Sequence, residues 1–175
     1  MRLFVAIQLS EEMKDSIRDV QEQFRAQGVR GNYTTSENMH MTVAFIGEYN
    51  DPDKVLDALG AVSFAPFSIE MNSVGNFGDL WWTGIAESKE LNNLVKLVRH
   101  ELSDADIPFD RKRFLPHMTI LRKPAYTGSR SITTNIACTG MKVDHISLML
   151  STRGKNGMIY TELGSVYAQE TEETE

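Results

Sequence analysis

The sequence lacks several features that would assign it to a common class of protein. Cys138 is the only cysteine, so an internal disulfide is impossible and no second cysteine stands at a metal-ligand spacing. The apolar run at the N-terminus, Leu3 to Ile7, is far shorter than a membrane-spanning helix or a signal peptide requires. We therefore expect a cytoplasmic monomer with no membrane segment.

Positive charge is also scarce. Lysine and arginine number 18 against 24 acidic residues, which gives a net charge of -6 and a pI near 5.3. A protein that coats long stretches of nucleic acid needs a large basic surface to displace counterions, so this composition argues against that class. Recognition of a short nucleic-acid end or of a nucleotide remains open.

Motifs for nucleotide activation and metal binding are absent as well. The chain has no glycine-rich phosphate loop and no nucleotide-activating lysine motif, which argues against ATP-driven ligation. No His-x-His or Glu-x-x-His cluster accompanies its histidines, which argues against a metal-dependent hydrolase. We expect neither a metal ion nor another cofactor.

The pattern of apolar residues predicts an α+β fold. Hydrophobic residues make up 41% of the chain, and we expect a single compact domain of two intertwined lobes over residues 1–169, followed by a disordered acidic tail over residues 170–175. Three helices should begin after the capping residues Ser10, Asp51 and Ser88. Apolar and β-branched stretches predict strands at residues 2–7, 39–46, 67–71, 80–86, 143–150 and 158–163.

The two halves of the sequence repeat one order of elements. A strand from Arg2 and its following helix lead to His40, and a strand from Leu80 and its following helix lead to His117. The matching separations along the chain agree to within one residue. A duplication of two units predicts two lobes related by a pseudo-twofold axis. We expect antiparallel sheets to line a central cleft, helices to lie outside, and the two histidines to face each other.

Each of these histidines opens a His-x-Thr-x motif, His40 to Val43 and His117 to Ile120. Alternate residues of a strand share a face, so each motif presents an imidazole beside the hydroxyl of Thr42 or Thr119. Two imidazoles on opposite sides of one phosphorus atom can act as base and acid in an in-line displacement, and the hydroxyls can stabilise the phosphoryl oxygens. The chemistry alone does not decide which histidine is the acid.

A single His-x-Thr motif in a strand is most often a matter of ordinary packing. Two identical His-Met-Thr triplets, each followed by a β-branched residue at matched positions of a repeat, favour catalysis instead. The remaining histidines lack this context, because His100 lies off the apolar stripe of its predicted helix and His145 has no threonine two residues later. We expect neither to be catalytic.

Short segments around the two motifs carry a further signal. They are Glu37-Asn38, Phe45 to Glu48, Phe77-Gly78, Leu80 to Trp82 and Phe114 to Arg122. With these segments the chain resembles the two-histidine (2H) phosphoesterases, and most closely the RNA 2',3'-cyclic phosphodiesterases formerly called 2'-5' RNA ligases. The resemblance implies that His40 donates a proton to the leaving oxygen, that His117 accepts one from water, and that Thr42 and Thr119 bind the phosphate. It also implies that a 2',3'-cyclic phosphate at an RNA end is opened to a 2'-phosphate.

The resemblance assigns a role to one more residue. Arg122 stands where this family has an arginine after the second motif, and it is expected to contact the phosphate. Strand periodicity places it on the face opposite Thr119 unless the strand has ended. Of Trp81 and Trp82, one should belong to the core while the other is able to stack a base. Basic residues near the second motif are candidates for contacting an RNA backbone: Arg99, Arg111, Lys112, Arg113, Arg122, Lys123 and Arg130.

Other functions stay open on the sequence alone. The same two histidines would suit a phosphodiesterase of a small nucleotide, such as a cyclic ADP-ribose phosphate or a 2'-5' oligonucleotide, and the motifs do not separate these substrates. A non-catalytic module that binds RNA ends is an alternative from another class. The intact histidine and threonine pairs argue against that module, so RNA ends or nucleotides with a 2',3'-cyclic phosphate are the expected partners.

Overall fold

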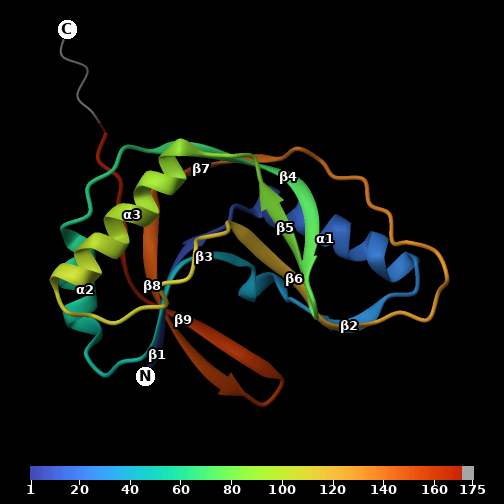
Figure 1. The fold of residues 1–175 in the computed structure, drawn as a ribbon, viewed down its shortest axis with the longest axis horizontal. Helices are drawn as coiled ribbons and strands as arrows, with labels where there is room; N and C mark the ends of the chain where they lie inside the picture. The colour runs from blue at the N-terminus through green and yellow to red at the C-terminus, as the bar shows by residue number, and fades with distance from the viewer. Residues whose placement is uncertain (171–175) are drawn as a thin grey trace, which may run out of the picture.

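The computed structural model describes residues 1–170, which form two antiparallel sheets with helices outside them (Figure 1). Sheet A contains β1 (Arg2–Gln8), β3 (His40–Glu48), β8 (His145–Gly154) and β9 (Gly157–Tyr167), in the order β3-β1-β8-β9. Sheet B contains β2 (Arg30–Tyr33), β4 (Phe67–Phe77), β5 (Leu80–Ile85), β6 (His117–Ala125) and β7 (Gly140–Val143), in the order β2-β6-β5-β4-β7. The predicted α+β fold with antiparallel sheets is confirmed.

Each α-helix begins where a side chain caps it. The helices are α1 (Glu11–Ala26), α2 (Pro52–Gly60) and α3 (Lys89–Asp104), and a short 3-10 turn, η1 (Ser36–Asn38), precedes β3. The hydroxyls of Ser10 and Ser88 and the carboxylate of Asp51 each accept a hydrogen bond at 3.1 Å from the backbone amide three residues later. All three predicted caps therefore hold helix N-termini.

The two halves of the chain exchange their helices. Helix α1 follows β1 of sheet A but packs against β6 and β7 of sheet B. Helix α3 follows β5 of sheet B and packs mainly against α2 and β3 of sheet A, with a smaller contact to β4. Figure 1 shows α1 at one end of the molecule and α2 and α3 at the other. A large cluster of buried apolar side chains draws on both sheets and all three helices. The helices therefore link the two sheets through one shared hydrophobic core.

The described structure differs from the predicted strands in one place and extends them in others. The stretch predicted as one strand over residues 143–150 is divided at Asp144, because Val143 ends β7 in sheet B and His145 begins β8 in sheet A. Strand β2 was not predicted, and β9 runs farther than its apolar pattern. Strands β8 and β9 form a hairpin that projects from the body (Figure 1).

Two further expectations concern the ends and the membrane. No helix within residues 1–170 is long and apolar enough to span a membrane. The acidic tail predicted over residues 170–175 lies, apart from Glu170, outside the described residues.

Candidate active site

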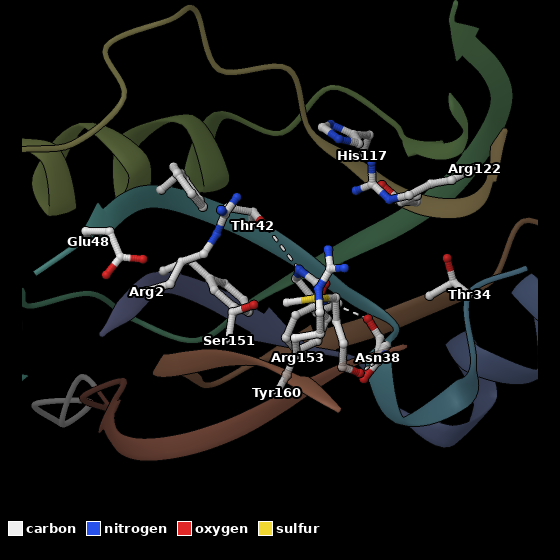
Figure 2. A pocket seen from close by; sticks show the side chains of 15 residues that line it. Arg2, Thr34, Asn38, Thr42, Glu48, His117, Arg122, Ser151, Arg153 and Tyr160 are labelled. Carbon is white, nitrogen blue, oxygen red and sulfur yellow. Dashed lines mark hydrogen bonds between the residues drawn. The ribbon is translucent and has the colours of Figure 1, made fainter. Parts of the chain in front are cut away.

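Both His-x-Thr motifs line one cleft of about 600 Å³. His40 and Thr42 come from the first residues of β3, and His117 and Thr119 come from the first residues of β6. The opening residues of the two strands alternate in the same way between half-buried and buried positions. The structure therefore brings the four residues of the duplicated motif to a shared space, and Figure 2 shows Thr42 and His117 on its walls.

The backbone fixes the orientation of both imidazoles. In His40, Nδ1 lies 2.7 Å from the carbonyl oxygen of Asn38, and in His117, Nδ1 lies 2.7 Å from the carbonyl oxygen of Leu115. A carbonyl only accepts hydrogen bonds, so each Nδ1 carries a hydrogen and Nε2 is the nitrogen that can gain or lose a proton toward the cleft. His40 Nε2 also lies 3.1 Å from the hydroxyl oxygen of Thr42.

Aromatic rings surround His40. Its ring centroid lies 5.0 Å from that of Phe4 and 5.1 Å from that of Tyr160, which meets it edge-on at 85°. Burial lowers the pKa of His40, because an apolar environment disfavours the charged imidazolium. The hydrogen bond to the backbone carbonyl raises this pKa, while the nearby positive charges of Arg122 and His117 lower it further.

A β-bulge in each strand decides which later side chain faces the cleft. Pairing of β3 with β1 skips Val43, and pairing of β6 with β5 skips Ile120, each the third residue after its histidine. The skipped residue and its successor are both buried, so the alternation along the strand shifts by one position. The fifth residue after each histidine, Phe45 or Arg122, consequently lines the cleft. Arg122 and Thr119 therefore face the same cleft although β6 continues to Ala125, and the placement of Arg122 opposite Thr119 that strand periodicity predicts is wrong.

The second bulge is held by a buried amide from α1. Gln21 is only 3% exposed, and its side-chain nitrogen donates to the carbonyl oxygens of Thr34 at 2.8 Å and Ile120 at 3.0 Å. The backbone amide of Thr34 donates to the same Ile120 carbonyl at 3.0 Å. A buried side-chain amide that donates to two backbone carbonyls restrains the backbone at both positions. Gln21 therefore helps to set the direction of Arg122.

Several residues of the cleft were not singled out from the sequence. Arg2 and Phe4 reach it from β1, Ser151 and Arg153 from β8, and Tyr160 from β9. The alternation of side chains along β1 places Arg2 and Phe4 on one face. No local sequence pattern predicts that the β8–β9 hairpin lies near the two motifs. The hairpin reaches the motifs through tertiary contacts. The side-chain nitrogen of Asn38 in η1 donates a hydrogen bond at 2.9 Å to the backbone carbonyl oxygen of Met158 in β9.

Other candidates from the sequence lie outside this cleft. His100 contacts Asp104 at 3.2 Å on α3, and His145 contacts Asp144 at 2.7 Å. Of the basic residues around the second motif, Arg122 alone is among the lining residues. The expected RNA contacts at the others are therefore not part of the cleft.

The two tryptophans do not reach the cleft either. Trp81 meets the core residue Phe24 edge-on, with ring centroids 5.1 Å apart, while Trp82 lies 5.3 Å from Phe77. Phe77 in turn meets His117 edge-on at 5.4 Å. The aromatic side chains that line the cleft are instead Phe4, Phe45 and Tyr160.

This arrangement can move protons on both sides of a bound anion. Two imidazoles offer Nε2 to one cleft, and two hydroxyls and a guanidinium are available to bind an oxyanion. Within residues 1–170, no three histidine, cysteine, aspartate or glutamate side chains gather as a metal site would require. The duplicated α+β fold with paired His-x-Thr strands is that of a two-histidine phosphoesterase.

Comparison with known proteins identifies the family. The profile of the 2'-5' RNA ligase superfamily matches residues 6–155, and the chain belongs to this superfamily. It is 31% identical over 172 residues to the RNA 2',3'-cyclic phosphodiesterase of Methanocaldococcus jannaschii, covering 91% of this chain and 96% of that protein. It is 29% identical over 176 residues to the RNA 2',3'-cyclic phosphodiesterase of Thermotoga maritima, covering 93% of each.

Solved structures show the same fold. A protein of Thermus thermophilus superimposes with a TM-score of 0.81 at 24% identity, covering 95% of this chain and 97% of that one. Escherichia coli LigT in its apo form superimposes with a TM-score of 0.81 at 21% identity, covering 97% and 98%. These likenesses extend over nearly the whole of each chain.

Proposed function

We propose that this protein hydrolyses the 2',3'-cyclic phosphate at the end of an RNA chain to a 2'-phosphate, with His40 as the acid and His117 as the base. The observation that carries the proposal is the convergence of both imidazoles on one cleft, each held at Nδ1 by a backbone carbonyl. The names of the relatives described above support the same substrate.

The proposed reaction adds one water molecule across the P–O3' bond. The water oxygen attacks phosphorus opposite O3' while Nε2 of His117 takes a proton from it. The P–O3' bond breaks, and Nε2 of His40 gives its proton to the departing O3'. Donors from Thr42, Thr119 and Arg122 bind the non-bridging oxygens, where negative charge grows in the transition state. Proton exchange with solvent then restores both histidines.

The pKa of His40 links its role as an acid to substrate binding. Burial and the neighbouring charges of Arg122 and His117 lower this pKa, so the free protein favours the neutral imidazole. A bound phosphodiester places a negative charge beside the ring, which favours the imidazolium. His40 is therefore charged most readily when the substrate that receives its proton is bound.

The test uses purified protein and an oligoribonucleotide that ends in a 2',3'-cyclic phosphate. Phosphorus NMR distinguishes the two products, and we expect the 2'-phosphate. A predominant 3'-phosphate would show that the ribose binds with O2' toward His40, which contradicts the proposed orientation. An unopened cyclic phosphate contradicts the function itself.

We further propose that the protein acts without a metal ion, as a monomer in the cytoplasm. The exposed, unpaired Cys138 supports a reducing compartment. Turnover should persist in excess EDTA, because the proposed mechanism assigns both proton transfers and the charge stabilisation to side chains. Loss of turnover on chelation, with recovery on adding a divalent ion, contradicts this part of the proposal.

A further inference from the structure

The division of labour between the two histidines sets the direction of the bound RNA. The inference rests on the proposed function, in which the oxygen that leaves phosphorus belongs to the terminal ribose. In-line displacement puts the attacking water and the leaving oxygen on opposite sides of phosphorus. With the acid at His40 and the base at His117, the ribose lies on the His40 side. The nucleotides that precede it must then leave the cleft from that side.

The His40 side of the cleft carries two arginines. Strand register places Arg2 of β1 beside Ser151 of β8, and Ser151 beside Tyr160 of β9. Arg153 is two residues beyond Ser151 and so shares its face of the sheet. All four side chains line the cleft, and Figure 2 shows them on the side of sheet A. The guanidinium of Arg2 is also held over the ring of Phe45, 5.0 Å from its centroid.

The cleft carries more positive charge than one bound phosphate group requires. The lining residues include the guanidiniums of Arg2, Arg122 and Arg153 against a single carboxylate, that of Glu48, in a protein of net charge -6. Glu48 already accepts a hydrogen bond from the N-terminal amine at 3.2 Å. Neither Arg2 nor Arg153 forms an ion pair with a carboxylate of residues 1–170. A cyclic phosphate carries one negative charge, so a second anion matches the remaining two arginines.

We propose that Arg2 and Arg153 bind the phosphodiester group on the 5' side of the terminal nucleotide. The substrate is then the end of an RNA chain with at least two nucleotides. A mononucleoside 2',3'-cyclic phosphate fits the reacting centre but lacks the second anion. The two arginines thus determine specificity for chain ends over free cyclic nucleotides, a distinction that the His-x-Thr motifs do not make.

Three substrates test the inference on the wild-type protein. They are a dinucleotide with a terminal 2',3'-cyclic phosphate, the same dinucleotide with a neutral methylphosphonate internal linkage, and the corresponding mononucleoside 2',3'-cyclic phosphate. We expect kcat/KM to be roughly tenfold or more higher for the first than for the other two, as charge-assisted hydrogen bonds imply. Equal values for the charged and neutral linkages overturn the inference. If the protein opens none of the three, the proposed function fails and the inference fails with it.

Single-residue variants test whether Arg2 and Arg153 cause the preference for the charged dinucleotide. Arg2→Ala and Arg153→Ala should each reduce kcat/KM for the charged dinucleotide roughly tenfold more than for the mononucleoside substrate. Each should also flatten the salt dependence for the dinucleotide, because one salt-screened contact between opposite charges is removed. The matched control is Arg30→Ala, which removes an exposed arginine outside the cleft and should change neither ratio. Equal losses on both substrates would place the arginine at the reacting phosphate and overturn the inference.

Discussion

The two halves of the cleft share a backbone and differ in the side chains around each histidine. Both carry a bulge three residues after the histidine and a 2.7 Å contact between Nδ1 and the carbonyl two residues earlier. Each imidazole also meets an aromatic ring edge-on, Tyr160 at 85° and Phe77 at 84°. The halves diverge at the fifth residue after the histidine, which is Phe45 in one and Arg122 in the other.

Duplication of one half does not by itself produce an acid and a base. Two identical halves would give both imidazoles the same proton affinity, so neither would be assigned to the acid or the base. Burial and the guanidinium of Arg122 make the two sites unequal, because both lower the pKa of His40 in the free protein. The negative charge of a bound phosphodiester opposes this effect, so His40 gains its proton as the substrate binds. In the proposed mechanism, Arg122 of β6 also supplies a cation for the bound phosphate, for which β3 has no counterpart.

The largest expected effect comes from removing either imidazole. His40→Ala and His117→Ala should each lower kcat by roughly 10² to 10⁴-fold, the range typical of positioned acid–base catalysis. The double variant should lose little more, since groups that act as a unit are not additive. Steady-state rates on the cyclic-phosphate oligonucleotide measure this, with circular dichroism as the control for folding. Near wild-type turnover in one single variant would mean that the two halves do not act together.

A smaller effect is expected at the position where the halves diverge. Arg122→Ala should lower kcat/KM by roughly ten- to a hundredfold, because it removes charge-assisted hydrogen bonds to the phosphate. Phe45→Ala should cost less than tenfold, because the ring is already half-buried in the free protein and the substrate covers only its remaining surface, a contribution of about 1 kcal/mol. Arg122→Lys keeps the charge but not the planar fork, so it should recover only part of the loss. A larger loss of kcat/KM in Phe45→Ala than in Arg122→Ala would contradict the assignment of the phosphate-binding cation to the second half of the cleft.

The smallest effect concerns stability. Because folding lowers the pKa of His40 from an unfolded value near 6.5, the unfolded chain takes up a proton first as the pH falls. The free energy of unfolding should therefore decline as the pH drops from about 6.5 through the folded-state pKa, and should be unaffected by this group above about 6.5. His40→Gln should decline less over the same range. Urea titrations at several pH values measure the difference, and a wild-type protein that gained stability relative to the variant on acidification would contradict it.

The helices and the motif pairs could be predicted because their signals are local. Ser10, Asp51 and Ser88 each lie within three residues of the amide they cap. A histidine and a threonine two residues apart share a face as long as the strand is regular between them. The expectation that the two motifs face each other needed more, namely the comparison of the two halves of the sequence.

The direction of Arg122 could not be predicted, because its cause is distant. It depends on a bulge at Ile120 whose carbonyl accepts from Gln21, a residue 99 positions earlier. Arg153 and Tyr160 join the cleft because β8 pairs with the distant strand β1 and the β8–β9 hairpin lies against the residues just before β3. The end of β7 at Val143 was missed for a related reason, since that strand has only four residues and runs almost directly into β8.

The bulges also change how natural variation in these strands should be interpreted. Leu121 is buried in the core, whereas Arg122, the next residue, lines the cleft. A substitution at the first position is expected to reduce the yield of folded protein, and one at the second to alter the choice of substrate. Regular pairing of Ile120 with β5 would exchange these two positions, whereas deletion of Ile120 would remove the bulge and leave Leu121 in the core and Arg122 in the cleft. In an alignment of relatives, a one-residue gap at this point therefore marks a strand without the bulge that still directs the residue at the place of Arg122 to the cleft.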